Sequence, residues 1–305
     1  MKQILFAVLL LTTIALAAQC PDPKSKELMF SLNDSLIEQE MMALSQQTTV
    51  PLHYNSQVKS FISLYVNNRK KQTNAMLQRS YTYFPIIEAG LRQHGLPDEL
   101  KYMVMVESAM NPTATARDGK KGLWQLSPTL AKRYDLTIND EINECFDPEL
   151  STDIACKCLG QLYDYYDDWL LALTAYDLGA AYVDRAIEAA EGCKDYWILQ
   201  QHLPIEVRGY IPAYMAIVYI MSRPEQYGLY PVCPVNVWLD TETVKLAEPM
   251  TFDQIENRLG ITMETLTKFN PKYINKTIPA SSESPQSIRL PKEMVAQFKQ
   301  TFKTT

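Results

Sequence analysis

Histidine is scarce in this chain: only three occur among 305 residues, at His53, His94 and His202. So few and so scattered, they argue against a histidine-built metal site and against a Ser-His-Asp triad. A positive charge excess is also absent, since the formal net charge is −6, which argues against nucleic acid as the main partner. No compositional bias of the disordered, collagen-like or small disulfide-rich kind is present. We therefore expect a globular protein without a metal or other cofactor.

Long apolar runs are limited to one, at the N-terminus. Lys2 precedes a mostly apolar stretch from Ile4 to Ala18 that ends in small side chains, a pattern typical of a secretory signal over residues 1–18. A buried helix is the alternative, and the run is too short for a membrane anchor. We expect an exported, periplasmic protein whose mature chain has no integral membrane segment. Gln19 disfavours lipid attachment at Cys20, where a small preceding residue is usual.

An exported protein meets an oxidising environment, in which its six cysteines could form disulfides. Cys156 and Cys158 are too close to bridge each other within a helix, so each would need another partner. Buried free thiols are the alternative.

The polarity pattern divides the rest of the chain into segments. Apolar residues at helical spacing dominate a preamble (19–76) and a main domain (77–230), and strand-like alternation is nearly absent. A linker (231–241) leads to a β-α-α-β pattern (242–292), and a tail (293–305) ends the chain. The predicted fold class is mainly α with a small β-α-α-β domain. Residues 244–305 hold 9 basic and 6 acidic residues, so the net acidity belongs to the helical part.

Glu107 lies at the end of a predicted helix that begins near Pro97. Leu100, Met103, Val104 and Glu107 follow the spacing of one buried helical face. Burial disfavours the ionised form of a carboxyl group, which is how a protein keeps a glutamate protonated as a general acid near neutral pH. A glutamate at the edge of the stripe, paired with a lysine or arginine, is the alternative.

Three later motifs accompany this helix: GLWQL at 122–126, AYDLG at 175–179 and EVRGYIP at 206–212. Together with VESAMNP at 106–112, they resemble the goose-type-lysozyme-like catalytic domain of the family 1 lytic transglycosylases, specifically the membrane-bound lytic murein transglycosylase D group. The resemblance extends from about residue 50 to about residue 221. It implies a lysozyme-like helical fold and peptidoglycan glycan strands as the substrate.

The resemblance also implies roles for individual residues. Glu107 would be the single acid/base, and Tyr210, preceded by the matching Glu206, would position it. The other implied substrate-binding residues are Ser108, Gly122, Gln125, Tyr176 and Asp177, with Trp124 packed beside them. Core packing is the alternative for the aromatic residues. The family usually has asparagine where this chain has Asp177, and an ionised aspartate cannot donate a hydrogen bond.

The implied reaction cleaves the bond between N-acetylmuramic acid and N-acetylglucosamine without water, giving 1,6-anhydromuramic ends. Hydrolysis of the goose-type lysozyme kind is the alternative, with Asp118 or Asp177 as a second carboxylate, although Asp118 beside Gly119 also suits a turn. A protein that binds the cell wall without cleaving it is a further alternative.

The C-terminal pattern resembles a lysin motif (LysM), a module that binds peptidoglycan. Its strands are expected near residues 243–246 and 287–290, and its helices near 251–259 and 262–269. Its glycan groove is expected near residues 249–252 and 270–274. A small domain that only packs against the catalytic one is the alternative.

Overall fold

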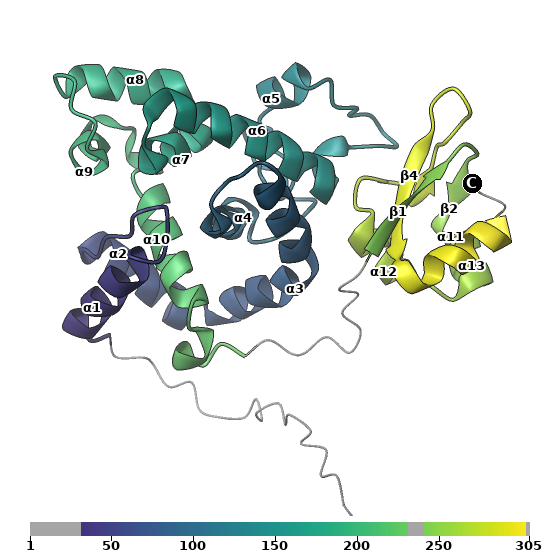
Figure 1. Ribbon diagram of the computed structural model, residues 1–305, viewed down its shortest axis with the longest axis horizontal. Helices are drawn as coiled ribbons and strands as arrows, with labels where there is room; N and C mark the ends of the chain where they lie inside the picture. Colours follow the sequence, from purple (N-terminus) through teal and green to yellow (C-terminus); the bar gives the residue numbers. More distant parts are fainter. Residues whose placement is uncertain (1–31, 231–240, 303–305) are drawn as a thin grey trace, which may run out of the picture.

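The computed structural model describes residues 32–230 and 241–302, which form a large helical domain and a small mixed domain (Figure 1). The expected signal sequence, Cys20, Cys233 and nearly all of the expected linker lie outside these residues. Within the described part, no helix is long and apolar enough to cross a membrane.

The large domain is built from α-helices joined by short 3-10 turns and one π-helical turn, η1 (Leu64–Asn68). This confirms the predicted mainly α class. Its α-helices are α1 (Asp34–Ser45), α2 (Ser56–Ser63), α3 (Lys70–Gln93), α4 (Met103–Ser108), α5 (Pro128–Arg133), α6 (Pro148–Tyr166), α7 (Trp169–Leu178), α8 (Ala180–Ala189), α9 (Tyr196–Leu199) and α10 (Tyr210–Met221). Its 3-10 turns are η2 (Asp98–Tyr102), η3 (Glu144–Phe146), η4 (Gln200–His202), η5 (Ile205–Val207) and η6 (Pro224–Tyr227).

Polar residues at the helix starts satisfy the free backbone N–H groups there. The side chain of Asp147 accepts hydrogen bonds from the N–H groups of Glu149 and Leu150 at the start of α6. Asp168 accepts one from Leu171 at the start of α7. Such caps define where a helix begins, so these aspartates fix the starts of α6 and of α7, the helix that carries Tyr176 and Asp177.

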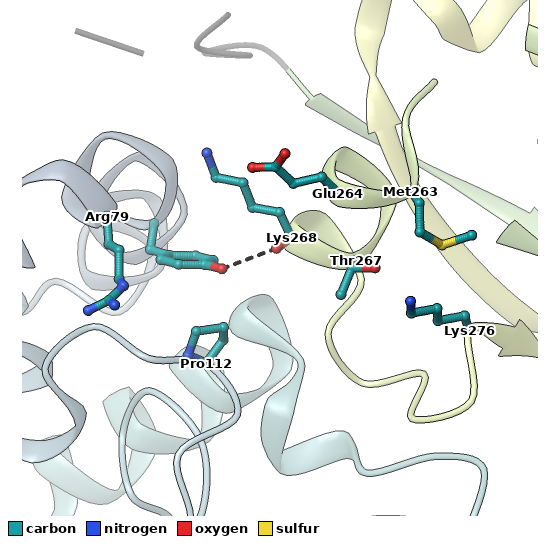
Figure 2. Close-up of a pocket in the computed structure, with 8 residues that line it drawn as sticks. Arg79, Pro112, Met263, Glu264, Thr267, Lys268 and Lys276 are labelled. Atoms are coloured by element: carbon teal, nitrogen blue, oxygen red, sulfur yellow. Dashed lines mark hydrogen bonds between the residues drawn. The ribbon is translucent and has the colours of Figure 1, made fainter. Parts of the chain in front are cut away.

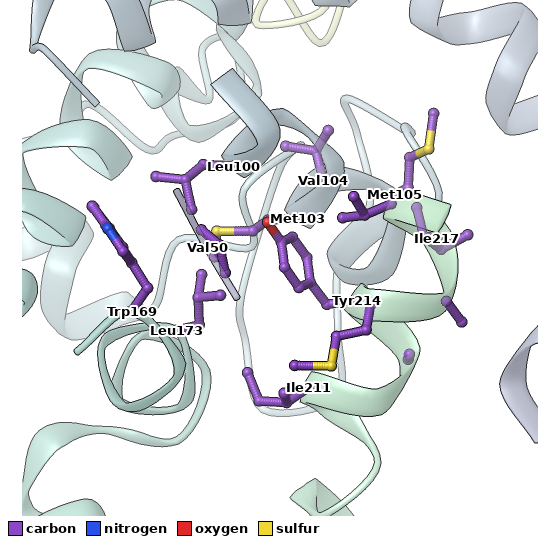
Figure 3. Close-up of a cluster of buried hydrophobic side chains, with 14 of the residues drawn as sticks. Val50, Leu100, Met103, Val104, Met105, Trp169, Leu173, Ile211, Tyr214 and Ile217 are labelled. Atoms are coloured by element: carbon purple, nitrogen blue, oxygen red, sulfur yellow. The ribbon is translucent and has the colours of Figure 1, made fainter. Parts of the chain in front are cut away.

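Helix α10 forms the centre of the large domain. Every residue from Ile211 to Met221 is buried, as expected for a helix that is apolar on all sides. It packs against α2, α4 and α7, and Figure 3 shows Tyr214 of α10 beside Met103 at the start of α4. The start of α10 is thereby held rigidly against the helix that carries Glu107.

The expected preamble belongs to this same core. Helix α3 runs without a break across the boundary expected between residues 76 and 77. Buried side chains before it, including Ile37, Met41 and Ile62, share one cluster with Met103 of α4 and Ile217 of α10. Residues 34–76 are therefore an integral part of the large domain.

The small domain has the predicted β-α-α-β order. Strand β1 (Thr241–Leu246) pairs antiparallel with β4 (Gln286–Pro291), and a shorter pair joins β2 (Met250–Thr251) to β3 (Thr277–Ile278). Between them lie α11 (Phe252–Leu259) and α12 (Met263–Phe269). A capping box of Thr251 and Gln254 begins α11, and Gly260, with φ +70°, ends it.

The expected tail is a helix instead. Helix α13 (Lys292–Phe302) follows β4 directly, and its Val295 and Phe298 are buried in the core of the small domain. Val295, Phe298 and Phe302 have the spacing of one helical face, so the signal for this helix is present in the sequence.

The two domains are in direct contact through the loop before α6. Ile142 of the large domain is buried in the hydrophobic core of the small one. The N–H of Asn143 donates to the carbonyl of Lys272 at 2.9 Å, and the N–H of Ile274 donates to Glu141 at 3.0 Å. An ion pair between Arg289 and Glu149 adds to this contact.

This contact covers part of the surface expected to form a LysM glycan groove. Lys272 and Tyr273 are buried, the backbone groups of Lys272 and Ile274 bond to the large domain, and Tyr273 forms an antiparallel bridge with Ile142. The small domain therefore uses this loop to attach to its neighbour.

Lys272 holds the contact electrostatically, and its loss should weaken the fold. Its Nζ lies 2.9 Å from Asp147 Oδ2, and the two side chains are only 10% and 19% exposed. We expect Lys272→Met to lower the unfolding free energy by about 1–3 kcal/mol, because the side chain of Asp147 loses its ionic partner at a position where water replaces it poorly. Urea unfolding measures this, with Lys245→Met on exposed β1 as the control. Equal effects of the two variants would refute the structural role of the pair.

Cys145, Cys156, Cys158 and Cys193 are free thiols in the described chain. For these four, the alternative of free thiols holds. Burial raises the pKa of Cys156 to about 12 and that of Cys145 to about 11, so neither is a reactive thiolate at neutral pH.

Candidate active site

The predicted apolar stripe leads to Glu107. Leu100, Met103 and Val104 are fully buried, and Glu107 follows them on the same face as a partly exposed residue. The predicted single helix is divided into two parts here, the 3-10 turn η2 and the α-helix α4, which ends at Ser108. The carboxyl group of Glu107 therefore lies at the end of a short helix whose apolar face is anchored in the core.

The chain turns sharply just after this helix. Ala109 and Met110 both have left-handed backbone conformations, with φ of 51° and 62°. Such conformations are costly for residues other than glycine and persist only where the surroundings hold them. Met110 is fully buried, and Arg79 Nη1 of α3 donates to the carbonyl of Ala109 at 3.0 Å. These contacts fix the end of α4 and thus the position of Glu107.

Glu107 is in a setting that favours its protonated form. Burial, and next the negative charge of Asp177, raise its pKa to about 8, although Tyr210 and Lys120 act in the opposite direction. The hydroxyl of Tyr210 donates a hydrogen bond to Glu107 Oε1 at 2.7 Å. The structure thus brings together the two residues whose pairing the resemblance implied, 103 positions apart in the chain.

The loop that carries Gly122 and Gln125 is tightly built. Gly122 has φ +84°, and a Cβ there would lie 2.0 Å from the carbonyl oxygen of Cys145, so only glycine fits. Gln125 is buried with φ 47°, and its Nε2 donates to the carbonyl of Gly122 at 2.8 Å. The hydroxyl of Tyr176 donates to the carbonyl of Trp124 at 2.8 Å, which ties this loop to α7.

Two of the predicted residues also have structural roles. Ser108 is buried, and its hydroxyl donates to the carbonyl of Val104 at 3.0 Å. Trp124 is fully buried, and its indole N–H donates to the hydroxyl of Thr152 at 2.9 Å. Glu206, in contrast, is exposed on the turn before α10.

Asp177 has a partner, Lys120, that the sequence motifs do not indicate. Lys120 Nζ lies 2.8 Å from its Oδ1 and 2.7 Å from its backbone carbonyl, and both side chains are about one fifth exposed. Burial by itself would lower the pKa of Lys120, but the hydrogen bond and charge of Asp177 outweigh it and the pKa is raised. Adjacent lysines at 120 and 121 were the only signal in the sequence.

Asp118 lies at the edge of this group. Its side chain is 60% exposed, 3.9 Å from Lys120 Nζ, and it accepts a hydrogen bond from the N–H of Lys120. This is the geometry of a turn residue. In the described chain, no group of three or more histidine, cysteine, aspartate or glutamate residues is arranged to hold a metal ion.

Comparison with family models matches two segments of the chain. Residues 84–198 match the transglycosylase SLT domain, and the segment includes Glu107, Gln125, Tyr176 and Asp177. Residues 240–305 match the LysM-like domain of lytic transglycosylase MltD. The chain thus carries a transglycosylase SLT domain followed by an MltD-type LysM-like domain, which confirms both parts of the resemblance.

Among curated proteins, the chain is similar to the membrane-bound lytic murein transglycosylase D of Escherichia coli (strain K12), with 28% identity over 253 residues. The match covers 81% of this chain and 54% of that protein, so the chain spans about half the length of this relative. Among solved structures, the 70 kDa soluble lytic transglycosylase of Escherichia coli matches 67% of this chain and 33% of its own, with 17% identity and a TM-score of 0.43. The lytic transglycosylase Slt of Pseudomonas aeruginosa matches 45% of this chain and 23% of its own, with 17% identity and a TM-score of 0.36.

Proposed function

We propose that this protein is a lytic transglycosylase that cleaves peptidoglycan glycan strands between N-acetylmuramic acid and N-acetylglucosamine. The observation that carries the proposal is the pair of Glu107 and Tyr210. A carboxyl group with a pKa of about 8 is protonated near neutral pH, and the 2.7 Å hydrogen bond holds it in one orientation. This is what a general acid requires.

In the first step, Glu107 protonates the glycosidic oxygen. Tyr210 donates its hydrogen to Oε1, so Oε2 is the oxygen that carries the transferable proton. The C1–O bond breaks as the proton arrives, and the N-acetyl group of the muramic acid attacks the anomeric carbon from the opposite side. The chain therefore needs no nucleophile of its own.

In the second step, Glu107 acts as the base. Its carboxylate removes the proton from the C6 hydroxyl of the muramic acid, and the resulting oxygen attacks C1 to displace the N-acetyl oxygen. The product is a 1,6-anhydromuramic end, and Glu107 is protonated again for the next cycle. Protons and bonds balance without water.

The environment of the two aspartates supports a mechanism with one carboxyl group. Asp177 is in an ion pair with Lys120 at 2.8 Å, and Asp118 is exposed in a turn. Hydrolysis of the goose-type lysozyme kind would need one of them as a second carboxylate. The ion pair with Lys120 occupies Asp177 Oδ1, so this oxygen is not free to attack the sugar or to activate a water.

End-group analysis tests the proposal. Purified peptidoglycan is digested with the full chain, and the fragments are analysed by mass spectrometry. We expect 1,6-anhydro ends, which are about 18 Da lighter than reducing ends because no water is added. Reducing ends would indicate a hydrolase, and an absence of cleavage between pH 4 and 8 would favour a non-catalytic wall-binding protein.

The Lys120–Asp177 pair should set the pH range of activity. Asp177 raises the pKa of Glu107 and Lys120 lowers it. We therefore expect the alkaline limb of kcat/KM to move about 0.5–1 pH unit down in Asp177→Asn and a similar distance up in Lys120→Met. Asp118→Asn, the exposed control, should move it less. Shifts of the same sign in the first two variants would contradict this electrostatic account.

We also propose that the protein acts outside the cytoplasm, where peptidoglycan is found. The basic Lys2 and the apolar stretch to Ala18 support export through a secretory signal. Mass spectrometry of the protein recovered from the periplasm tests this, since removal of residues 1–18 leaves a defined new N-terminus.

A further inference from the structure

A cavity of about 420 Å³ lies where the two domains meet. Helix α3 of the large domain contributes Arg79 and Tyr83, and the loop after Glu107 contributes Pro112. The small domain contributes the other lining residues, Met263, Glu264, Thr267, Lys268 and Lys276. Figure 2 shows the residues of the two domains facing each other across this space. Its volume falls in the range of small-ligand sites.

The cavity has a fixed shape because the domains are bonded beside it. The hydroxyl of Tyr83 donates to the carbonyl of Lys268 at 3.2 Å, which holds α12 against α3 (Figure 2). The buried Lys272–Asp147 pair keeps the small domain in place a few residues further along the chain. Arg79 of the large domain and Lys268 and Lys276 of the small domain therefore line the same cavity.

The charge of the cavity selects an anionic ligand. Arg79, Lys268 and Lys276 outnumber the single carboxylate, Glu264. None of these three cations forms an ion pair with any residue of the described chain, and Arg79 donates a hydrogen bond to the backbone carbonyl of Ala109. Unpaired cations around a concave surface are suited to bind carboxylates. Met263, Pro112 and the ring of Tyr83 add apolar contacts.

The cavity is also connected with the active site. Arg79 Nη1 bonds to the carbonyl of Ala109, two residues after Glu107, and Pro112 lines the cavity three residues further on. A ligand that contacts Arg79 therefore lies against the turn that fixes the end of α4. The segment from Ala109 to Pro112 thus joins the end of the helix that carries Glu107 to the wall of the cavity.

We infer that this cavity binds the acidic peptide stems that substitute the muramic acid residues of peptidoglycan. The inference rests on the proposed function, since that function supplies the glycan strand to which a stem is attached. The glycan consists of neutral N-acetylated sugars once the lactyl group is amide-linked, whereas the stems carry free carboxylates. Lysine and arginine bind the carboxylates, and the apolar wall accepts alanine methyl groups.

The attachment of the small domain is consistent with this role. The loop expected to bind glycan, residues 270–274, is packed against the large domain. The adjoining helix α12 keeps Glu264, Thr267 and Lys268 at the cavity. The LysM-like domain thus contributes one wall of a peptide-binding site through α12, and its loop 270–274 serves to attach it to the large domain.

Binding of a soluble stem peptide tests the inference without catalysis. The probe is the tetrapeptide L-Ala-γ-D-Glu-diaminopimelate-D-Ala, titrated by calorimetry into the full chain carrying Glu107→Gln. We expect saturable binding that Lys268→Gln with Lys276→Gln weakens about 3- to 10-fold, as for the loss of two partly exposed charge contacts. The matched control is Lys132→Gln with Lys245→Gln, which removes the same charge from exposed positions outside the cavity and should leave the affinity unchanged.

Two further measurements separate this inference from the proposed function. A peptide whose carboxylates are capped as amides should not bind, and equal binding of both peptides would overturn the inference. In active enzyme, the two cavity substitutions should lower kcat/KM on intact peptidoglycan but not on glycan stripped of its stems by an amidase. Equal loss on both substrates would also overturn it. Absence of cleavage by the wild type would refute the proposed function alone, because the calorimetric result stands without it.

Discussion

Replacing Glu107 with glutamine is expected to lower the rate of glycan cleavage by about 10²- to 10⁴-fold, the usual contribution of a positioned acid or base. Glutamine keeps the size of the side chain and can still accept the hydrogen bond from Tyr210, but it cannot supply a proton. The rate of release of anhydromuropeptides from purified peptidoglycan measures the effect. Glu188→Gln, an exposed substitution on α8, serves as the matched control and should retain full activity.

The same variant tests the raised pKa of the Glu107 carboxyl group without substrate. An ordinary glutamate has a pKa of about 4.5, whereas burial raises that of Glu107 to about 8, so the folded protein holds its proton more tightly than the unfolded chain does. The stabilisation from this proton is complete below pH 4.5 and is lost as the pH rises through 8. A glutamine has no such dependence.

Relative to the wild type, Glu107→Gln should therefore become more stable as the pH rises from about 4.5 to 8, and the difference should stay constant at higher pH. Urea unfolding at several pH values gives this difference directly. A variant that retains activity would exclude Glu107 as the acid. A stability difference independent of pH would show that Glu107 has the same pKa in the folded and unfolded chain, which would contradict the raised value.

Hydrophobic periodicity was sufficient to predict the buried helical face that precedes Glu107. Leu100, Met103 and Val104 repeat at helical spacing, and burial of that face follows from the hydrophobic effect alone. Local periodicity contains no information about which distant residue meets the carboxyl group. The partner, Tyr210, was found because the motif around it resembles a known family.

The ion pair beside the site could not be predicted in the same way. Lys120 and Asp177 are 57 positions apart, and they meet because the loop before Gly122 passes over the end of α7. The path of such a loop depends on tertiary packing, for example on the close approach of Gly122 to Cys145. Hydrophobic periodicity in the sequence gives no information about such contacts.

The attachment of the two domains was hidden for a related reason. Ile142 lies in a polar loop, where a single apolar residue is ordinary, yet it is buried in the core of the other domain. Lys272 likewise has the sequence appearance of a solvated charge, but it is buried opposite Asp147. Contacts between domains depend on surface shape, and hydrophobic periodicity describes only the inner face of each element.

Replacing Tyr210 with phenylalanine is expected to lower kcat about tenfold with little change in KM, because a hydrogen bond of about 1–1.5 kcal/mol to the acid is lost while the sugar contacts remain. Tyr210 lowers the pKa of Glu107, so its loss should also move the alkaline limb of activity to higher pH. A purely structural tyrosine would move neither kcat nor the limb.

The matched control for this substitution is one helical turn away. Tyr214 lies on the same helix and is fully buried, and its hydroxyl donates to the carbonyl of Glu99 at 3.2 Å. Tyr214→Phe should cost about the same stability, roughly 1 kcal/mol, without changing kcat or the pH profile. If both variants lost activity equally, the effect would come from the packing of α10.

A double variant decides whether Tyr210 acts through Glu107 alone. Residues that work as a unit have strongly non-additive effects, because once the acid is absent its positioning has no further value. Tyr210→Phe should therefore lower activity about tenfold in the wild type and hardly at all in Glu107→Gln. A full tenfold loss in both backgrounds would mean that the Tyr210 hydroxyl contacts the substrate itself, and Tyr210 would then be a catalytic residue in its own right.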